Sequence, residues 1–176
     1  MSNQQLIAIT FLADDRPGLI DRLAAVVSDH QGNWLDSSMA QLANQFAGIL
    51  LVSVPPDQCA TLEAALAQLA DEGVLAQLRQ SPLSESPAAA ALRHLELVAS
   101  DRPGIVSELS AVLAQLGVNV LRLDTRRIAA SMSASPLFSA SATINLPADL
   151  AQETLATELE ALSPDLQVSL GEPPAD

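Results

Sequence analysis

The chain has 176 residues, of which 49% are hydrophobic and only 2% aromatic, so it can build aliphatic cores and is not a disordered chain. Its formal charge is −13, from 21 acidic and 8 basic residues. This charge argues against direct binding of nucleic acid or of an anionic membrane, because both require clustered Lys and Arg. With a single cysteine, no signal peptide and no membrane-spanning apolar run, we expect a cytoplasmic protein.

The first predicted elements are a strand and a helix joined by a turn. Residues 6–13 alternate between apolar and other side chains, which predicts a half-buried strand. The turn is Asp-Arg-Pro-Gly, residues 15–18, and we expect Asp15 or a neighbour to cap the helix, with Pro17 in its first turn. The apolar spacing then predicts a helix to about His30, which Gly32 ends.

The rest of the first half predicts two strands, a helix and a last strand. The strands are expected at residues 34–40 and 46–54, the helix from Asp57, and the last strand at 74–80. The order βαββαβ predicts an α+β, ferredoxin-like fold, in which an antiparallel sheet carries both helices on one face.

The second half repeats the first. Asp-Arg-Pro-Gly returns at residues 101–104, a shift of 86, and the second copy carries six extra residues between Asn119 and Phe138. Strands are expected near 92–99, 118–126, 138–146 and 166–170, and helices near 103–116 and 150–162. The predicted domains are therefore 1–83 and 92–176, with a linker at 84–91. Because each sheet would leave one face bare, we expect the modules to pair with each other and the chain to form a homodimer.

The turn between the first strand and helix of each module is the candidate ligand site. A helix start presents free N–H groups and a positive dipole end, which together favour a carboxylate. A glycine there leaves room for a ligand. We expect the next strand to lie beside the first, so that an Asn at its start could face the same crevice. The alternatives without a ligand are that each Asp-Arg-Pro-Gly segment is only a capped turn, and that each asparagine is only a turn residue. The candidate ligand-binding residues are Asp15, Arg16, Pro17, Gly18, Leu19, Ile20, Asn33, Asp101, Arg102, Pro103, Gly104, Ile105, Val106 and Asn119.

These residues resemble a known family. A strand, Asp-Arg-Pro-Gly followed by two branched aliphatic residues, a helix and then Gly-Asn or Gly-x-Asn is similar to the ACT domain. The tandem arrangement, with Met39, residues 46–52 and residues 135–138, is similar to the group of transcriptional repressors of the glycine cleavage system. One departure is that Gly32 and Asn33 are adjacent, whereas Val118 separates the second pair.

The resemblance implies a regulatory function, and we expect no cofactor. It implies an amino acid bound at the strand–helix turn, with glycine favoured as effector. It also implies control of transcription through a DNA-binding regulatory protein. The alternative is a constitutive interaction module that binds no small molecule.

An enzyme is disfavoured, because no triad, paired carboxylates or metal-ligand spacing is present in the sequence. The one basic cluster, Arg122, Arg126 and Arg127, is interpreted either as charge that protects a strand edge or as a contact for an acidic partner. The small, polar stretch 129–136 beside it is expected to be a mobile loop over a ligand or a partner-docking loop.

Overall fold

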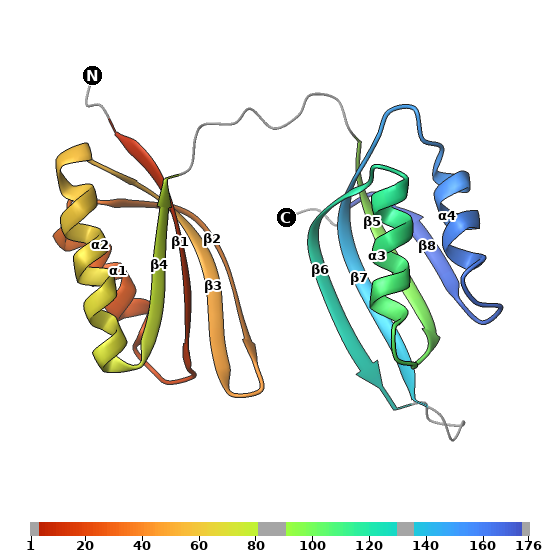
Figure 1. Ribbon diagram of the computed structural model, residues 1–176, viewed down its shortest axis with the longest axis horizontal. Coiled ribbons are helices and arrows are strands. Elements are labelled where there is room, and N and C mark those ends of the chain that lie inside the picture. The colour runs from red at the N-terminus through yellow and green to blue at the C-terminus, as the bar shows by residue number, and fades with distance from the viewer. Residues whose placement is uncertain (1–3, 81–90, 130–135, 174–176) are drawn as a thin grey trace. The chain divides into compact units, whose positions relative to one another are not determined.

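The computed structural model describes residues 4–80, 91–129 and 136–173. The chain divides into two compact units, Met1–Glu85 and Ser86–Asp176, each built around its own sheet (Figure 1). The expected linker at 84–91 lies outside the described residues, except for Ala91, with which a strand begins.

The first module has the predicted βαββαβ order. Its four strands form one antiparallel sheet in the order β2-β3-β1-β4, and both α-helices cover the same face of it (Figure 1). Two short 3-10 helices flank the second α-helix. The elements are β1 (Gln5–Asp14), α1 (Leu19–Asp29), β2 (Asn33–Leu42), β3 (Gln45–Val54), η1 (Pro56–Gln58), α2 (Cys59–Gln68), η2 (Leu69–Glu72) and β4 (Val74–Gln80).

The second module repeats this architecture with the strand order β6-β7-β5-β8. Its two helices also lie together on one face of its sheet (Figure 1). The prediction of two ferredoxin-like α+β modules is therefore confirmed. The elements are β5 (Ala91–Ser100), α3 (Ile105–Gln115), β6 (Asn119–Ile128), β7 (Leu137–Leu146), α4 (Gln152–Glu160) and β8 (Gln167–Gly171).

Each module has an aliphatic core between its sheet and its helices, as the scarcity of aromatic residues requires. In β1 the alternate residues Ile7, Ile9 and Phe11 are buried, which is the period of a half-covered strand. Leu62 and its equivalent Leu155, on α2 and α4, are fully buried. The two sets of buried residues form separate clusters, so each module holds its own core.

The start of the first helix differs from the expectation. Gly18, not Asp15, occupies the N-cap position, with φ 90°, and α1 begins at Leu19. Pro17 consequently lies in the turn before the helix. Gly104 does the same before α3, with φ 89°. The turn needs a left-handed residue between strand and helix, and glycine adopts that conformation without steric cost.

The expected place of the strand that begins with Asn33 is also wrong. β3 lies between β1 and β2, so β2 is an edge strand and does not neighbour β1. Asn33 is opposite Ser53, which is opposite Leu6 at the start of β1. The Asp-Arg-Pro-Gly turn follows the other end of β1, about 26 Å away along the strand. Asn119 is equally far from the turn of its module. It is opposite Asn145, which is opposite Leu92 at the start of β5.

The six extra residues of the second copy lengthen the connection between its two middle strands. In the first module Ala43 and Asn44 alone join β2 to β3, with φ 49° and 62°, as in a type I′ hairpin. Residues 129–136 join β6 to β7, eight residues against two. Most of this stretch, 130–135, lies outside the described residues, so the expectation of a mobile or docking loop stays an expectation.

Candidate functional site

A hollow of 330 Å³ lies at the turn between β1 and α1. All six turn residues predicted for the first module line it, together with Asp21 and Phe46. The start of α1 has no side-chain cap, so its first N–H groups stay available to a ligand. Leu19 itself is buried, so it can offer its backbone but not its side chain. Ile20 is 51% exposed and supplies an apolar wall.

The arginine of the first turn is held by the end of η2, just before β4, which lies beside the end of β1. Arg16 donates from Nη2 to the backbone oxygen of Glu72, at 2.8 Å, at the end of η2. Arg22, one turn into α1, binds the carboxylate of Glu72 with N–O distances of 2.7 to 3.1 Å. The hydrogen bonds from Arg22 lower the pKa of Glu72 and raise the pKa of Arg22. The turn is thereby fixed to the loop before β4.

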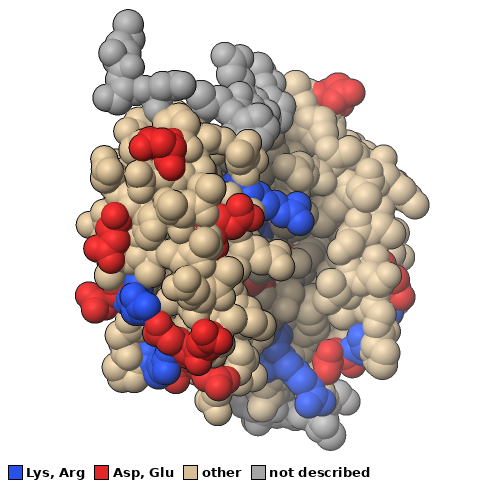
Figure 2. All heavy atoms as spheres, turned by 60° about the vertical axis from the view of Figure 1, so that its left-hand side comes forward, with Lys and Arg blue, Asp and Glu red and all other residues tan. Residues whose placement is uncertain are grey.

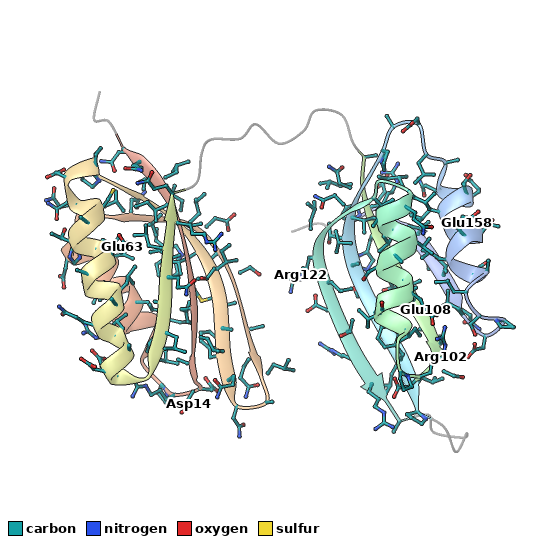
Figure 3. All side chains as sticks on the ribbon, viewed as in Figure 1. Asp14, Glu63, Arg102, Glu108, Arg122 and Glu158 are labelled. Carbon is teal, nitrogen blue, oxygen red and sulfur yellow. The ribbon has the colours of Figure 1, made fainter. Side chains whose placement is uncertain are left out.

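The second turn holds its arginine differently. Arg102 donates both Nη groups to the carboxylate of Glu108 on α3, and Figure 3 shows the two side chains together at the start of that helix. This pairing lowers the pKa of Glu108 and raises that of Arg102. Asp101 accepts a hydrogen bond from Arg127 Nε at 2.8 Å. The turn arginine that binds the end of η2 in the first module thus binds the following helix in the second.

The cause is a charge reversal at one equivalent position of the two helices. Arg22 and Glu108 are separated by the repeat shift of 86. A positive side chain in α1 binds Glu72 of another element, whereas a negative side chain in α3 binds the turn's own Arg102. The duplicated motif therefore sits in two different electrostatic settings, and the two turns are not interchangeable as ligand sites.

The structure brings together only part of the predicted site in each module. The turn residues adjoin the helix start in both modules, and Val106 is 43% exposed there, as Ile20 is. Asn33 and Asn119 lie at the opposite ends of their sheets. Ile105 is buried, like Leu19.

Several residues at the turns were missed by sequence reasoning. Glu72 and Asp165 come from the loops before β4 and β8, and Asp165 accepts the backbone N–H of Ser100 at 2.8 Å. No local pattern marks them, because they reach the turns only through tertiary structure. The exchange of Arg22 for Glu108 was visible in the aligned repeat.

Other kinds of site find little support in the described ranges. No group of three or more His, Cys, Asp or Glu side chains is placed there to hold a metal ion. None of the described helices combines the length and the apolar character that crossing a membrane requires.

Two duplicated ferredoxin-like modules, each with an uncapped helix start beside a left-handed glycine, define a tandem of small α+β domains. Sequence models of the ACT domain match residues 5–77 and, separately, residues 93–160. The chain therefore belongs to the ACT-domain family and carries two copies of the domain.

Similar proteins extend this likeness over the whole chain. The glycine cleavage system transcriptional repressor of Escherichia coli (strain K12) is 23% identical over 167 residues, which cover 94% of this chain and 88% of the relative. A crystal structure of an unknown protein from Galdieria sulphuraria has a TM-score of 0.80 at 26% identity, covering 97% of this chain and 99% of that one. One assigned as a glycine cleavage system transcriptional repressor has a TM-score of 0.69 at 21% identity, covering 97% and 98%.

Proposed function

We propose that this protein is a non-enzymatic, cytoplasmic regulator that binds a small amino acid, glycine being favoured, and controls transcription by binding a DNA-binding regulatory protein. Two ACT domains and the similarity to a transcriptional repressor support a regulatory role in amino-acid sensing. Glycine and the DNA-binding partner are carried over from the relative's name and from the resemblance.

The observation that carries the proposal is the hollow at the start of α1. Uncapped N–H groups at the positive end of the helix would receive the carboxylate of an amino acid. The carboxylates of Asp15 and Asp21 line the same hollow and would receive its ammonium group. An anion without the ammonium group would meet those two acidic side chains unpaired, so the hollow favours a zwitterion over a simple anion.

Size and affinity fit a metabolite sensor. Glycine has five heavy atoms, and at a ceiling of about −1.5 kcal/mol per atom its affinity cannot exceed roughly a few micromolar. The hollow of 330 Å³ leaves room beyond glycine, so serine and alanine belong in the same test. The amino acid can shift the equilibrium between a conformation that binds the partner and one that does not only by as much as its affinities for these two conformations differ.

The complete proposed site needs more than one module. Within one module Asn33 lies at the opposite end of the sheet from Gly18, so Asn33 or Asn119 would reach a ligand only from a second module or a second copy. We therefore propose a homodimer in which all the predicted turn residues and both asparagines contribute. The alternative, an interaction module without ligand, is favoured by one observation: the Arg102 guanidinium is already occupied by Glu108.

The charge of the chain supports an indirect action on DNA. The net charge is −13, from 21 acidic and 8 basic residues, and Figure 2 shows acidic side chains at many places on the face in view. Such a surface repels a polyanion. Contact with DNA through a separate protein is the arrangement that this charge permits.

The test is calorimetric titration with glycine, serine and alanine, combined with Gly18→Asn. Asparagine tolerates a positive φ, so this variant keeps the turn and adds a side chain where glycine leaves open space. We expect saturable binding to the wild type and its loss in Gly18→Asn. Gly117→Asn is the matched control. Gly117 also has a positive φ, 68°, but it lies outside both Asp-Arg-Pro-Gly turns, so this variant should bind like the wild type. If none of the three amino acids gave a binding signal, amino-acid sensing would be refuted.

A further inference from the structure

The helix-free face of the second module's sheet carries an organised set of polar side chains. Two rows cross three neighbouring strands, in register, on this face. In one row His94 of β5 is opposite Thr143 of β7, which is opposite Arg122 of β6. The next row on that face is Glu96, Ser141 and Asp124.

These rows form a hollow rather than a flat surface. Its volume is 410 Å³, and Figure 3 shows Arg122 pointing from β6 away from α3, toward the side of the sheet without helices. The hollow holds a guanidinium, an imidazole, a carboxylate and two hydroxyls. Its lining residues are Leu92, His94, Arg122, Asp124, Ser141, Thr143 and Pro173.

Several of these groups keep unused hydrogen-bonding capacity. Arg122 gives its Nε to Asp124 Oδ2, at 2.9 Å, and its side chain is 69% exposed, so its Nη groups can still receive a carboxylate. His94 Nε2 lies 3.4 Å from both Glu96 Oε1 and Ser141 Oγ. His94 Nδ1 and, on the same face, Asn145 Oδ1 are buried without a hydrogen-bond partner among the described residues.

The first module is an internal control, because the same rows there carry other residues. Ala8, Leu51 and Asp36 form one row, and Thr10, Ile49 and Ser38 form the other. Three of these six residues, Ala8, Leu51 and Ile49, are apolar, so the fold does not require the polar side chains of His94, Thr143 and Ser141 at the equivalent positions. Protection of a bare sheet against aggregation would apply equally to the first module, yet Ile49 there is 50% exposed. The polar set of the second module needs an explanation of its own.

We propose that this face of the second module is a separate site for a metabolite of the α-amino-acid class. The Nη groups of Arg122 bind the carboxylate in a bidentate manner, and Asp124 with Glu96 receives the ammonium group. Ser141 and Thr143 bind polar atoms of the side chain, so a polar amino acid is bound in preference to glycine. The site lies on the sheet face and does not depend on the strand–helix turns.

The test is a titration followed by amide chemical shifts, with L-glutamine, L-serine and glycine as probes up to roughly 10 mM. We expect saturable shifts at β5, β6 and β7 with L-glutamine and weaker ones with glycine. Arg122→Gln should weaken binding at least about tenfold, because it removes the bidentate partner. The double variant Ser141→Ile with Thr143→Leu installs the residue types of the first module, so it should fold normally and also lose binding.

Controls separate this site from the turn and from other basic residues of the same strand. Arg126→Gln removes a charge from the same strand and face and should bind L-glutamine like the wild type. Gly18→Asn, which closes the turn hollow, should also leave these shifts unchanged, so failure of the turn site would not imitate failure of this one. An absence of saturable shifts on β5–β7 with every probe, or binding that Arg122→Gln does not weaken, would overturn the proposal. L-glutamine amide and N-acetyl-L-glutamine, which lack the carboxylate and the ammonium group respectively, should each bind more weakly.

Discussion

Arg127 donates from Nε to Oδ2 of Asp101 across 2.8 Å and so ties the end of β6 to the turn before α3. The backbone N–H of Asp101 also donates to the oxygen of Pro136, at 3.0 Å, just before β7. Asp101 is thus bonded to both sides of the connection between β6 and β7. In the first module Asp15 makes the equivalent backbone bond to Asn44 at 2.8 Å, but that hairpin has only two connecting residues. Both ends of the longer connection in the second module are therefore bonded to its candidate ligand turn.

Arg127→Gln should loosen this turn without unfolding the module. Arg127 is 70% exposed, and exposed ion pairs contribute at most about 1 kcal/mol, so the free energy of unfolding should change by less than that. The Asp101 amide should exchange faster with solvent, because one of its anchors is lost. The measurement is hydrogen exchange at the Asp101 amide in Arg127→Gln, with Arg126→Gln as the control that removes a neighbouring charge. Equal exchange at Asp101 in both would show that the ion pair does not restrain the turn.

The separate cores predict that one substitution destabilises one module. Leu62→Ala and Leu155→Ala each remove a fully buried side chain at equivalent helix positions and should cost about 2–5 kcal/mol. Because the clusters do not share residues, calorimetry should show a lowered transition for the substituted module and an unchanged one for the other. Leu75→Ala, at a site that is 62% exposed, is the control and should change stability by about 0.5 kcal/mol or less. Equal lowering of both transitions by either core variant would mean that the modules unfold as one unit.

The sequence predicted which faces of the strands and helices are buried better than it predicted which strands are neighbours in the sheet. Alternation in β1 and helical spacing in α2 predict which side chains are buried, because burial on one face follows directly from the local period. That β3 separates β1 from β2 depends on pairing between distant segments, which no local pattern encodes.

The candidate site was predictable to the same extent. The Asp-Arg-Pro-Gly turn was found because it is continuous in the chain, and its six residues in the first module do line one hollow. Glu72 and Asp165 were missed because separate loops bring them to the turns. The polar rows on β5, β6 and β7 become visible only when the register places His94, Thr143 and Arg122 side by side.

Gly48 should be the least replaceable glycine of the first sheet. A Cβ there would lie 2.6 Å from Met39 Cγ and 2.9 Å from both Phe11 Cε1 and the backbone oxygen of Ser38. Gly48→Ala should therefore force the strands apart and cost about 1–3 kcal/mol, the usual range for overpacking. Gly171→Ala meets nothing within 4 Å and serves as the control. Denaturant unfolding of both variants is the measurement, and similar midpoints would contradict the close packing of β2 on β3.

Asp165 should make the second module sensitive to acid. Hydrogen bonds from Ser100 and then Ser163 hold the pKa of Asp165 far below its usual value. Because the folded-state pKa lies below the unfolded value of about 3.9, the ionised carboxylate stabilises the fold above about pH 4, and this stabilisation is lost progressively as the pH falls further. Asp165→Asn should lower the melting temperature of the second module at pH 7. The difference from the wild type should narrow between about pH 4 and pH 2.

Asp149→Asn controls for the loss of one negative charge, since Asp149 is exposed in the turn before α4. It should lower the melting temperature at pH 7 less than Asp165→Asn does, because it breaks no bond to the end of β5. A gap between the wild type and Asp165→Asn that stayed constant down to pH 2 would show that the ionised form of Asp165 is not what stabilises the second module.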